Sequence, residues 1–194
     1  MTDSKKNDPL VLLMEGNKRF ASEKSIHPHQ DSAQRKKVSS GQKPFAVIVG
    51  CSDSRVPPEI IFDQGIGDLF IIRVAGNIVD DMALGSIEYA VEHLGTELVV
   101  VLGHSKCGAV TATAKGEEAP GHIESIAKII KPAVEKAKGQ KGDIIENAIR
   151  NNIEMVKNKI LSSEPIITKM VREGRLKVIG AYYDIDTGIV EFEN

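Results

Sequence analysis

The sequence Cys51-Ser-Asp53-Ser-Arg55 follows an apolar run, residues 45–50, and His104-Ser-Lys-Cys107-Gly108 follows a second apolar run, residues 98–103. Each run has the length of a buried β-strand. A helical pattern lies between them at about residues 82–94, and strands that alternate with helices are typical of a parallel sheet. Ligands bind beyond the carboxyl ends of the strands of such a sheet. If the two strands are neighbours, we expect both polar segments to reach one crevice.

The rest of the chain continues the alternation of strands and helices. A long polar surface connection is expected over residues 21–42, and a proline at position 132 is expected to kink or divide one helix. The pattern predicts an α/β fold, with a central, mostly parallel β-sheet flanked by helices, an N-terminal helical arm and a C-terminal edge strand. We expect a single domain over residues 1–194, in which residues 1–42 are the N-terminal helix and the connection. Helices are expected at about residues 9–20, 82–94, 108–116, 123–138, 143–161 and 165–173, and strands at about 45–49, 69–74, 98–102, 176–184 and 189–193.

Composition excludes several classes of function. The net charge is −2, with 41% hydrophobic and 27% charged residues, so the sequence lacks the basic surface that binds nucleic acid or an anionic membrane. No apolar run approaches the roughly 20 residues that span a bilayer, and the polar residues 1–8 lack the apolar stretch of a signal peptide. We therefore expect a cytoplasmic protein. Its two cysteines should stay reduced there, which favours metal binding or catalysis over a disulfide.

Cys51, His104 and Cys107 are the candidate metal ligands. Two thiols and an imidazole suit zinc, and three protein ligands with an open fourth position are typical of a catalytic zinc site. A single free cysteine is more often a small buried hydrophobic residue. The combination of these three residue types at two strand ends nevertheless favours a metal site.

Asp53 and Arg55 have two interpretations. They could form a surface ion pair, worth about 0–1 kcal/mol. Alternatively, they lie beside the metal, where Asp53 would accept a hydrogen bond from bound water or would itself occupy the fourth position in a closed state. Arg55 would then hold the carboxylate in a bidentate contact and decide between these states.

The two motifs together resemble the β-class carbonic anhydrases. The resemblance covers about residues 42–112, and the strand at residues 178–182 also fits. It implies a zinc lyase that reversibly hydrates carbon dioxide to bicarbonate and a proton. One zinc per chain would be held by Cys51, His104 and Cys107, with Asp53 and Arg55 as the catalytic dyad.

The resemblance also implies substrate-binding residues. Gln42 matches a glutamine that hydrogen-bonds the substrate, and Gly108 matches a glycine whose N–H faces bicarbonate. Phe70 and Tyr89 match aromatic residues that line the substrate pocket from a neighbouring subunit. A homodimer or a higher even-numbered homo-oligomer is therefore expected, with carbon dioxide and bicarbonate as its small-molecule partners and with no nucleic acid or membrane partner.

One departure from the family pattern concerns regulation. Arg73 matches a family arginine, but Ile48 stands where the bicarbonate-inhibited members carry a tryptophan, which argues against an inhibitory bicarbonate site.

Two other functions stay open at this point. Family relatives hydrolyse carbon disulfide or carbonyl sulfide with the same metal ligands. A non-catalytic zinc-binding module, with Asp53 closing the metal permanently, is the alternative of a different class.

Overall fold

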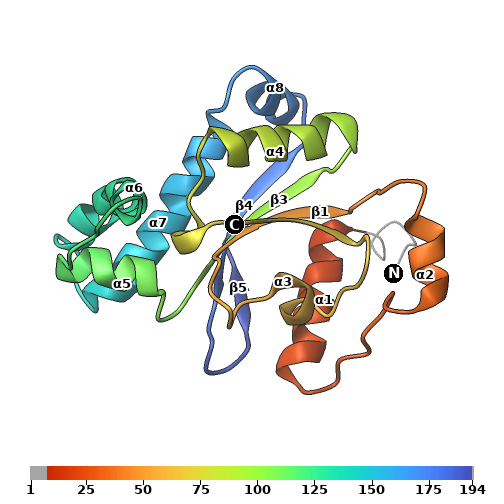
Figure 1. Ribbon diagram of the computed structural model, residues 1–194, viewed down its shortest axis with the longest axis horizontal. Helices are drawn as coiled ribbons and strands as arrows, with labels where there is room; N and C mark the ends of the chain where they lie inside the picture. Colours follow the sequence, from red (N-terminus) through yellow and green to blue (C-terminus); the bar gives the residue numbers. More distant parts are fainter. Residues whose placement is uncertain (1–7, 194) are drawn as a thin grey trace.

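A five-stranded sheet forms the centre of the computed structural model, which describes residues 8–193 (Figure 1). The strands lie in the order β2-β1-β3-β4-β5. All neighbouring pairs are parallel except β4 and β5, which are antiparallel. The predicted α/β class and the C-terminal edge strand are thus confirmed. The strands are β1 (Ala46–Gly50), β2 (Leu69–Arg73), β3 (Leu98–His104), β4 (Lys177–Tyr183) and β5 (Val190–Phe192).

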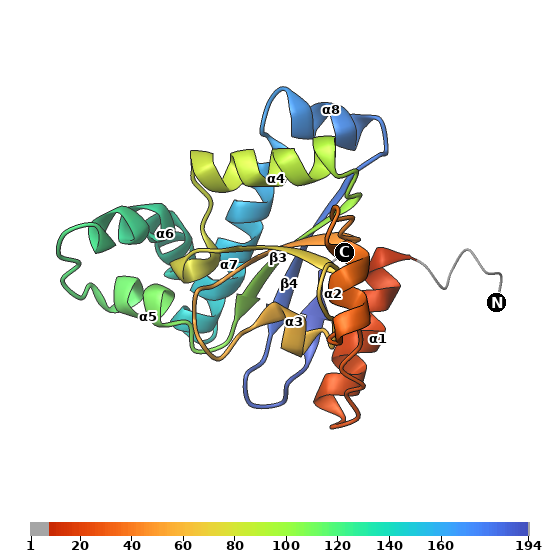
Figure 2. The same ribbon diagram turned by 45° about the vertical axis from the view of Figure 1, so that its right-hand side comes forward.

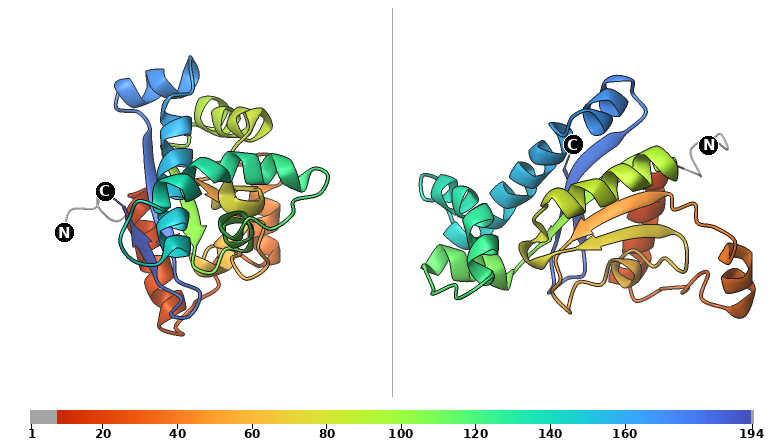
Figure 3. Two further views of the ribbon diagram at one scale, coloured as in Figure 1. Left: turned by 90° about the vertical axis from the view of Figure 1, so that its left-hand side faces the viewer. Right: turned by 45° about the horizontal axis from the view of Figure 1, so that its top comes forward.

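Helices cover both faces of the sheet, with α1 and α7 on opposite sides in the left panel of Figure 3. Helices α5 and α6 lie at one end of the molecule and α2 at the other (Figures 1 and 2). Because both faces are covered, every residue of β1 and β3 is buried, which explains their continuous apolar sequences. The helices are α1 (Pro9–Ala21), α2 (Ser32–Val38), α3 (Pro58–Ile61), α4 (Asp81–His93), α5 (Gly108–Lys115), α6 (Ile123–Ala137), α7 (Ile144–Leu161) and α8 (Ile166–Arg172), and a short 3₁₀ turn, η2, covers Ala75–Asn77.

Helix α7 packs closely against β3 and β4. Its buried residues Ile149, Ile153, Val156 and Ile160 follow helical spacing, and Asp143 caps its N-terminus through the N–H groups of the first turn. Close packing requires a glycine at position 103 of β3, where an added Cβ would lie 2.5 Å from the Cγ1 atom of Ile153. This helix therefore has a fixed position behind the carboxyl end of β3.

The strand order places a topological switch point between β1 and β3. The chain continues from β1 to β2 on one side of β1 and then places β3 on its other side. Connections that diverge from two neighbouring strands leave a crevice at their carboxyl ends, where ligands bind in open α/β sheets. Cys51 directly follows β1, and His104 ends β3. The two polar segments therefore meet at this crevice.

Three local features differ from the expectations. The connection at residues 21–42 contains α2, which Asp31 caps through the N–H of Gln34. The turn of helix α3, Pro58–Ile61, was also not expected. Helix α6 continues through Pro132, which lies on its exposed side. The polar residues 1–8, which argue against a signal peptide, lie almost entirely outside the described residues. Within residues 8–193, no helix combines the length and the apolarity that crossing a bilayer requires.

An ion pair joins α1 to the end of α3 and gives a pH-dependent contribution to stability. Arg19 donates to the carboxylate of Asp63, whose side chain is fully buried. Burial by itself raises the pKa of Asp63, but the hydrogen bonds from Arg19 and from the N–H groups of Ile26 and His27 outweigh it and hold this pKa below its usual value. The stabilisation is present above the unfolded-state pKa of about 3.9 and is lost as the pH falls through the lower folded-state pKa.

We expect Arg19→Ala to lower the free energy of unfolding by about 2 kcal/mol at neutral pH, because the buried carboxylate loses a charged hydrogen-bond partner. The difference from wild type should narrow below about pH 4, as the pH falls toward the lowered folded-state pKa at which Asp63 is protonated. Urea unfolding at neutral and acidic pH measures both effects. Lys18→Ala, an exposed residue of the same helix end, is the matched control. An equal loss of stability at both pH values would contradict this account.

Candidate metal centre

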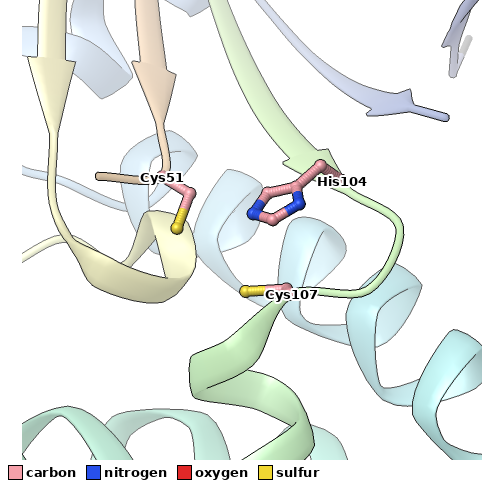
Figure 4. Close-up of side chains that lie close together, drawn as sticks. All are labelled: Cys51, His104 and Cys107. Atoms are coloured by element: carbon pink, nitrogen blue, oxygen red, sulfur yellow. The ribbon is translucent and has the colours of Figure 1, made fainter. Parts of the chain in front are cut away.

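Three buried side chains converge beyond the carboxyl ends of β1 and β3 (Figure 4). The Sγ atoms of Cys51 and Cys107 and a ring nitrogen of His104 all lie within 4.8 Å of one another. The two segments that supply them are more than fifty residues apart in the sequence and are brought together by the pairing of β1 with β3. The structure therefore groups the three predicted ligands around one point.

The imidazole of His104 is oriented for metal binding. Its Nδ1 atom lies 2.9 Å from the carbonyl oxygen of Ser105. A carbonyl only accepts hydrogen bonds, so Nδ1 carries the proton and Nε2 carries the free lone pair. Nε2 is buried and has no hydrogen-bond partner within residues 8–193. A buried nitrogen lone pair that faces two sulfur atoms fits a zinc ion, which accepts both donor types.

The first sulfur atom lies in surroundings that favour its anionic form. The hydrogen bond with the Cys107 thiol, the neighbouring His104 and the N–H groups of Asp53 and Gly76 together lower the pKa of Cys51 to about 4, against the opposing effect of burial. The N–H of Gly76 lies 3.2 Å from the Cys51 Sγ atom. Since the thiolate is the form that binds metals, this pocket is prepared for zinc.

The second sulfur atom lies at the start of α5. The hydrogen bond with Cys51, burial and the negative charge of Cys51 raise the pKa of Cys107, while the N–H groups of Val110 and Ala109 act to lower it. Amide groups at the first turn of a helix stabilise negative charge nearby. A divalent cation between the two sulfur atoms would remove their mutual repulsion, so both thiols fit the deprotonated ligands of a zinc site.

Asp53 and Arg55 form a bidentate pair beside these ligands. The Nε and Nη2 atoms of Arg55 donate to the two carboxylate oxygens at 2.9 and 2.7 Å, and the Arg55 N–H adds a further bond of 2.9 Å. The guanidinium is the main reason that the pKa of Asp53 is held at about 2. The Oδ2 atom of Asp53 lies 3.9 Å from the Nε2 atom of His104. The carboxylate is therefore ionised and faces the pocket.

Arg73 anchors the loop that carries Cys51 and Asp53. From the end of β2, its Nε and Nη2 atoms donate to the carbonyl oxygens of Cys51 and Asp53 at 2.8 and 2.5 Å. From the sequence, Arg73 was notable only because it matches an arginine of the β-class family, and these contacts were not predicted. The contacts to the loop depend on the register of β2 beside β1, in which Gly50 pairs with Arg73.

Comparison with known proteins places this geometry in a family. Residues 46–190 match the family described as carbonic anhydrase. The chain belongs to the β-class carbonic anhydrases. It is 38% identical to carbonic anhydrase 2 of Mycobacterium tuberculosis, over 91% of this chain and 87% of the relative. It is 36% identical to a carbonic anhydrase of Mycolicibacterium smegmatis, over 94% and 90% of the two chains.

Two solved structures of β-class enzymes are similar to this chain over nearly its whole length. The β-carbonic anhydrase CcaA superposes with a TM-score of 0.75 at 30% identity and covers 95% of both chains. A structure from the study of two tetrameric β-carbonic anhydrases of Sordaria macrospora gives a TM-score of 0.74 at 30% identity, covering 94% of this chain and 95% of that one. The family membership and the Cys51–His104–Cys107 group together identify a zinc site of the β-class, with one zinc per chain.

The residues predicted to bind substrate fall into two groups. Gly108 follows the ligand Cys107 and begins α5, so it lies at the metal pocket. Phe70 lies toward the amino end of the strands, because it pairs with Val47 of β1. Val47 is four residues before Cys51, a separation of roughly 13 Å along a strand.

Tyr89 and Gln42 also lie away from the zinc ligands of their own chain. The ring of Tyr89 lies beside that of Phe70, with a centroid distance of 6.4 Å. Gln42 is exposed and lines a surface cavity of about 480 Å³ whose walls include none of the zinc ligands. The structure therefore brings Phe70 and Tyr89 together but does not bring either of them, or Gln42, to the metal pocket of the same chain.

Proposed function

We propose that this β-class carbonic anhydrase catalyses the reversible hydration of carbon dioxide to bicarbonate and a proton. The observation that carries the proposal is the buried Cys51–His104–Cys107 group, with the unpartnered lone pair of His104 facing the two sulfur atoms, in a chain of this family. Zinc held by these three residues supplies the Lewis acidity that makes a water molecule nucleophilic near neutral pH.

Asp53 orients the reacting water. Its carboxylate is ionised, and an ionised carboxylate only accepts hydrogen bonds, so it selects the orientation in which a water O–H points toward it. Arg55 keeps the carboxylate in place through two parallel hydrogen bonds. In the closed state considered above, Asp53 would have to leave this pair to ligate zinc, so the bidentate contact favours the open, catalytic site.

Gly108 receives the bicarbonate product. It is exposed and is the first residue of α5, where N–H groups have no carbonyl partner within the helix. Such N–H groups and the positive end of the helix dipole favour an anion. The space beside the Cα atom of Gly108 is open, since an added Cβ would meet no atom within 4 Å. With no side chain to shield it, the backbone there is accessible to a small ligand.

Carbon disulfide and carbonyl sulfide are the competing substrates. Stopped-flow measurement of proton release on mixing zinc-loaded protein with carbon dioxide tests the proposal. Hydrolysis of the two sulfur compounds, followed by sulfide release, is measured in parallel. We expect carbon dioxide hydration to be much the faster reaction. Faster sulfide release would replace the proposed substrate, and zinc binding without any turnover would indicate a closed, non-catalytic site.

We propose that the active form is a homodimer or a larger even-numbered homo-oligomer. Two observations support this: Gln42, Phe70 and Tyr89 lie away from the zinc of their own chain, and the edge strand β2 is only half-buried along its length although its sequence, Leu-Phe-Ile-Ile-Arg, is largely apolar. A second copy that covers this edge would bring the aromatic residues to a partner's zinc. The single-domain organisation over residues 1–194 and the cytoplasmic location stay predictions from the sequence.

Analytical ultracentrifugation over a range of concentrations is expected to show a dimer or a larger species, and carbon dioxide hydration should fall on dilution as the assembly dissociates. Tyr89→Ala should lower activity without removing zinc, because the residue serves a neighbouring subunit. A monomer with full activity would contradict the shared site.

A further inference from the structure

The turn that hydrogen-bonds the Cys51 sulfur is itself held by helix α7. Turn η2 lies beside Cys51, with α7 behind it (Figure 4). The N–H of Gly76 faces the Cys51 Sγ atom at 3.2 Å, and the carbonyl oxygen of the same residue accepts a hydrogen bond of 2.8 Å from the Nδ2 atom of Asn152. Asn152 is only 1% exposed. A chain of two hydrogen bonds therefore connects α7 to a zinc ligand.

The geometry of Gly76 makes this connection effective. The peptide group between Gly76 and Asn77 is fixed at both ends, because Asn152 binds its carbonyl and the Asn77 N–H donates to the carbonyl of Val74 at 2.9 Å. Gly76 has a φ of +70°, and an added Cβ would lie 2.6 Å from a side-chain carbon of Ile130. With the next peptide fixed, the torsions of Gly76 determine where its own N–H points.

Asn152 is poorly explained by helix packing alone. Its Oδ1 atom is buried and has no hydrogen-bond partner within the described residues 8–193. An unsatisfied buried acceptor lowers stability, so an apolar side chain would be favoured if the position served only to pack α7. The orientation of the amide is also defined, because only its NH₂ group can bond to the Gly76 carbonyl.

We propose that Asn152 is a positioning residue of the zinc site, which acts through Gly76 to direct an N–H onto the Cys51 thiolate. The proposal rests on the proposed function, in which Cys51 ligates zinc. A hydrogen bond to a thiolate withdraws electron density from the sulfur and fixes its direction. Residues that orient metal ligands in this way typically change metal affinity by about 10–100-fold when they are removed.

Asn152→Ala is the test, and Asn151→Ala is its matched control. Asn151 is the preceding residue of α7, is also buried, and donates its amide to the Ala133 carbonyl and to Gln140 instead of to the metal loop. We expect Asn152→Ala to bind zinc about tenfold more weakly in a chelator competition. In the cobalt-substituted protein, the thiolate-to-metal charge-transfer band should move to longer wavelength, because the sulfur becomes a better electron donor. Asn151→Ala should keep the wild-type affinity and band.

Wild-type zinc affinity and an unmoved cobalt band in Asn152→Ala would overturn the proposal, as would equal changes in both variants. Asn152→Leu, which lacks the N–H but retains a side chain of similar shape, gives the same readouts if the alanine variant does not fold. A wild-type protein that binds no zinc through Cys51, His104 and Cys107 would instead refute the proposed function. The failures of the two proposals are therefore distinguishable.

Discussion

Cys107→Ser is expected to lose most of its zinc and, with it, nearly all carbon dioxide hydration. Serine keeps the shape of the side chain but replaces a thiolate with a neutral hydroxyl, which is a far poorer zinc ligand. The loss of affinity should exceed the roughly 10–100-fold that follows removal of a hydrogen-bond partner of a ligand. Metal analysis after dialysis and a stopped-flow assay measure the two effects.

The fold of Cys107→Ser should remain, because the β3 and β4 register and the packing of α7 do not involve the sulfur. Circular dichroism provides this control. A variant that retained a full equivalent of zinc would show that the metal is held elsewhere, and the assignment of Cys107 would be wrong.

Asp53→Ala is expected to keep zinc but to lower the hydration rate by about 100-fold, the usual cost of removing one group that orients or accepts a proton in catalysis. Asp53 is not in the group of three metal ligands, and its role depends on a carboxylate held by Arg55. Arg55→Ala should have the same phenotype, since the carboxylate then loses its fixed orientation.

A matched control for this prediction is Asp186→Asn. Asp186 pairs with Lys106 on the same side of the molecule, but both side chains are mostly exposed, so the pair contributes little energy. We expect wild-type activity in that variant. If Asp53→Ala turned over carbon dioxide as fast as wild type, the dyad would have only a structural role.

The sequence predicted the metal ligands because they are local features of two strand ends. Cys51 and His104 each lie at the end of a buried apolar run, and strands of this kind have a direction and a carboxyl end that can be recognised without a structure. The same reasoning placed α7 through its regular isoleucine spacing. The existence of the sheet and its parallel arrangement followed from the same patterns.

Other parts of the site depend on contacts that have no local signal. The bond from Asn152 to Gly76 joins residues that are 76 positions apart, and the Gly76 N–H reaches a sulfur 25 positions earlier. No periodicity predicts such pairs, because they arise from how α7 and η2 pack together. Helix α2 was missed for a different reason: its seven residues are mostly polar and charged, and its start is marked chiefly by the Asp31 cap.

The most direct test of the account is the rate of carbon dioxide hydration by zinc-loaded protein, measured by stopped flow across the neutral to alkaline range before and after removal of zinc. Asp53 has a pKa of about 2 and stays ionised throughout this range, so it contributes no change of its own by titration. We predict a rate that rises with pH, because the reacting water must lose a proton. This activity should disappear when zinc is removed and return when zinc is restored. A rate that is independent of pH, or that survives complete removal of zinc, would contradict the account.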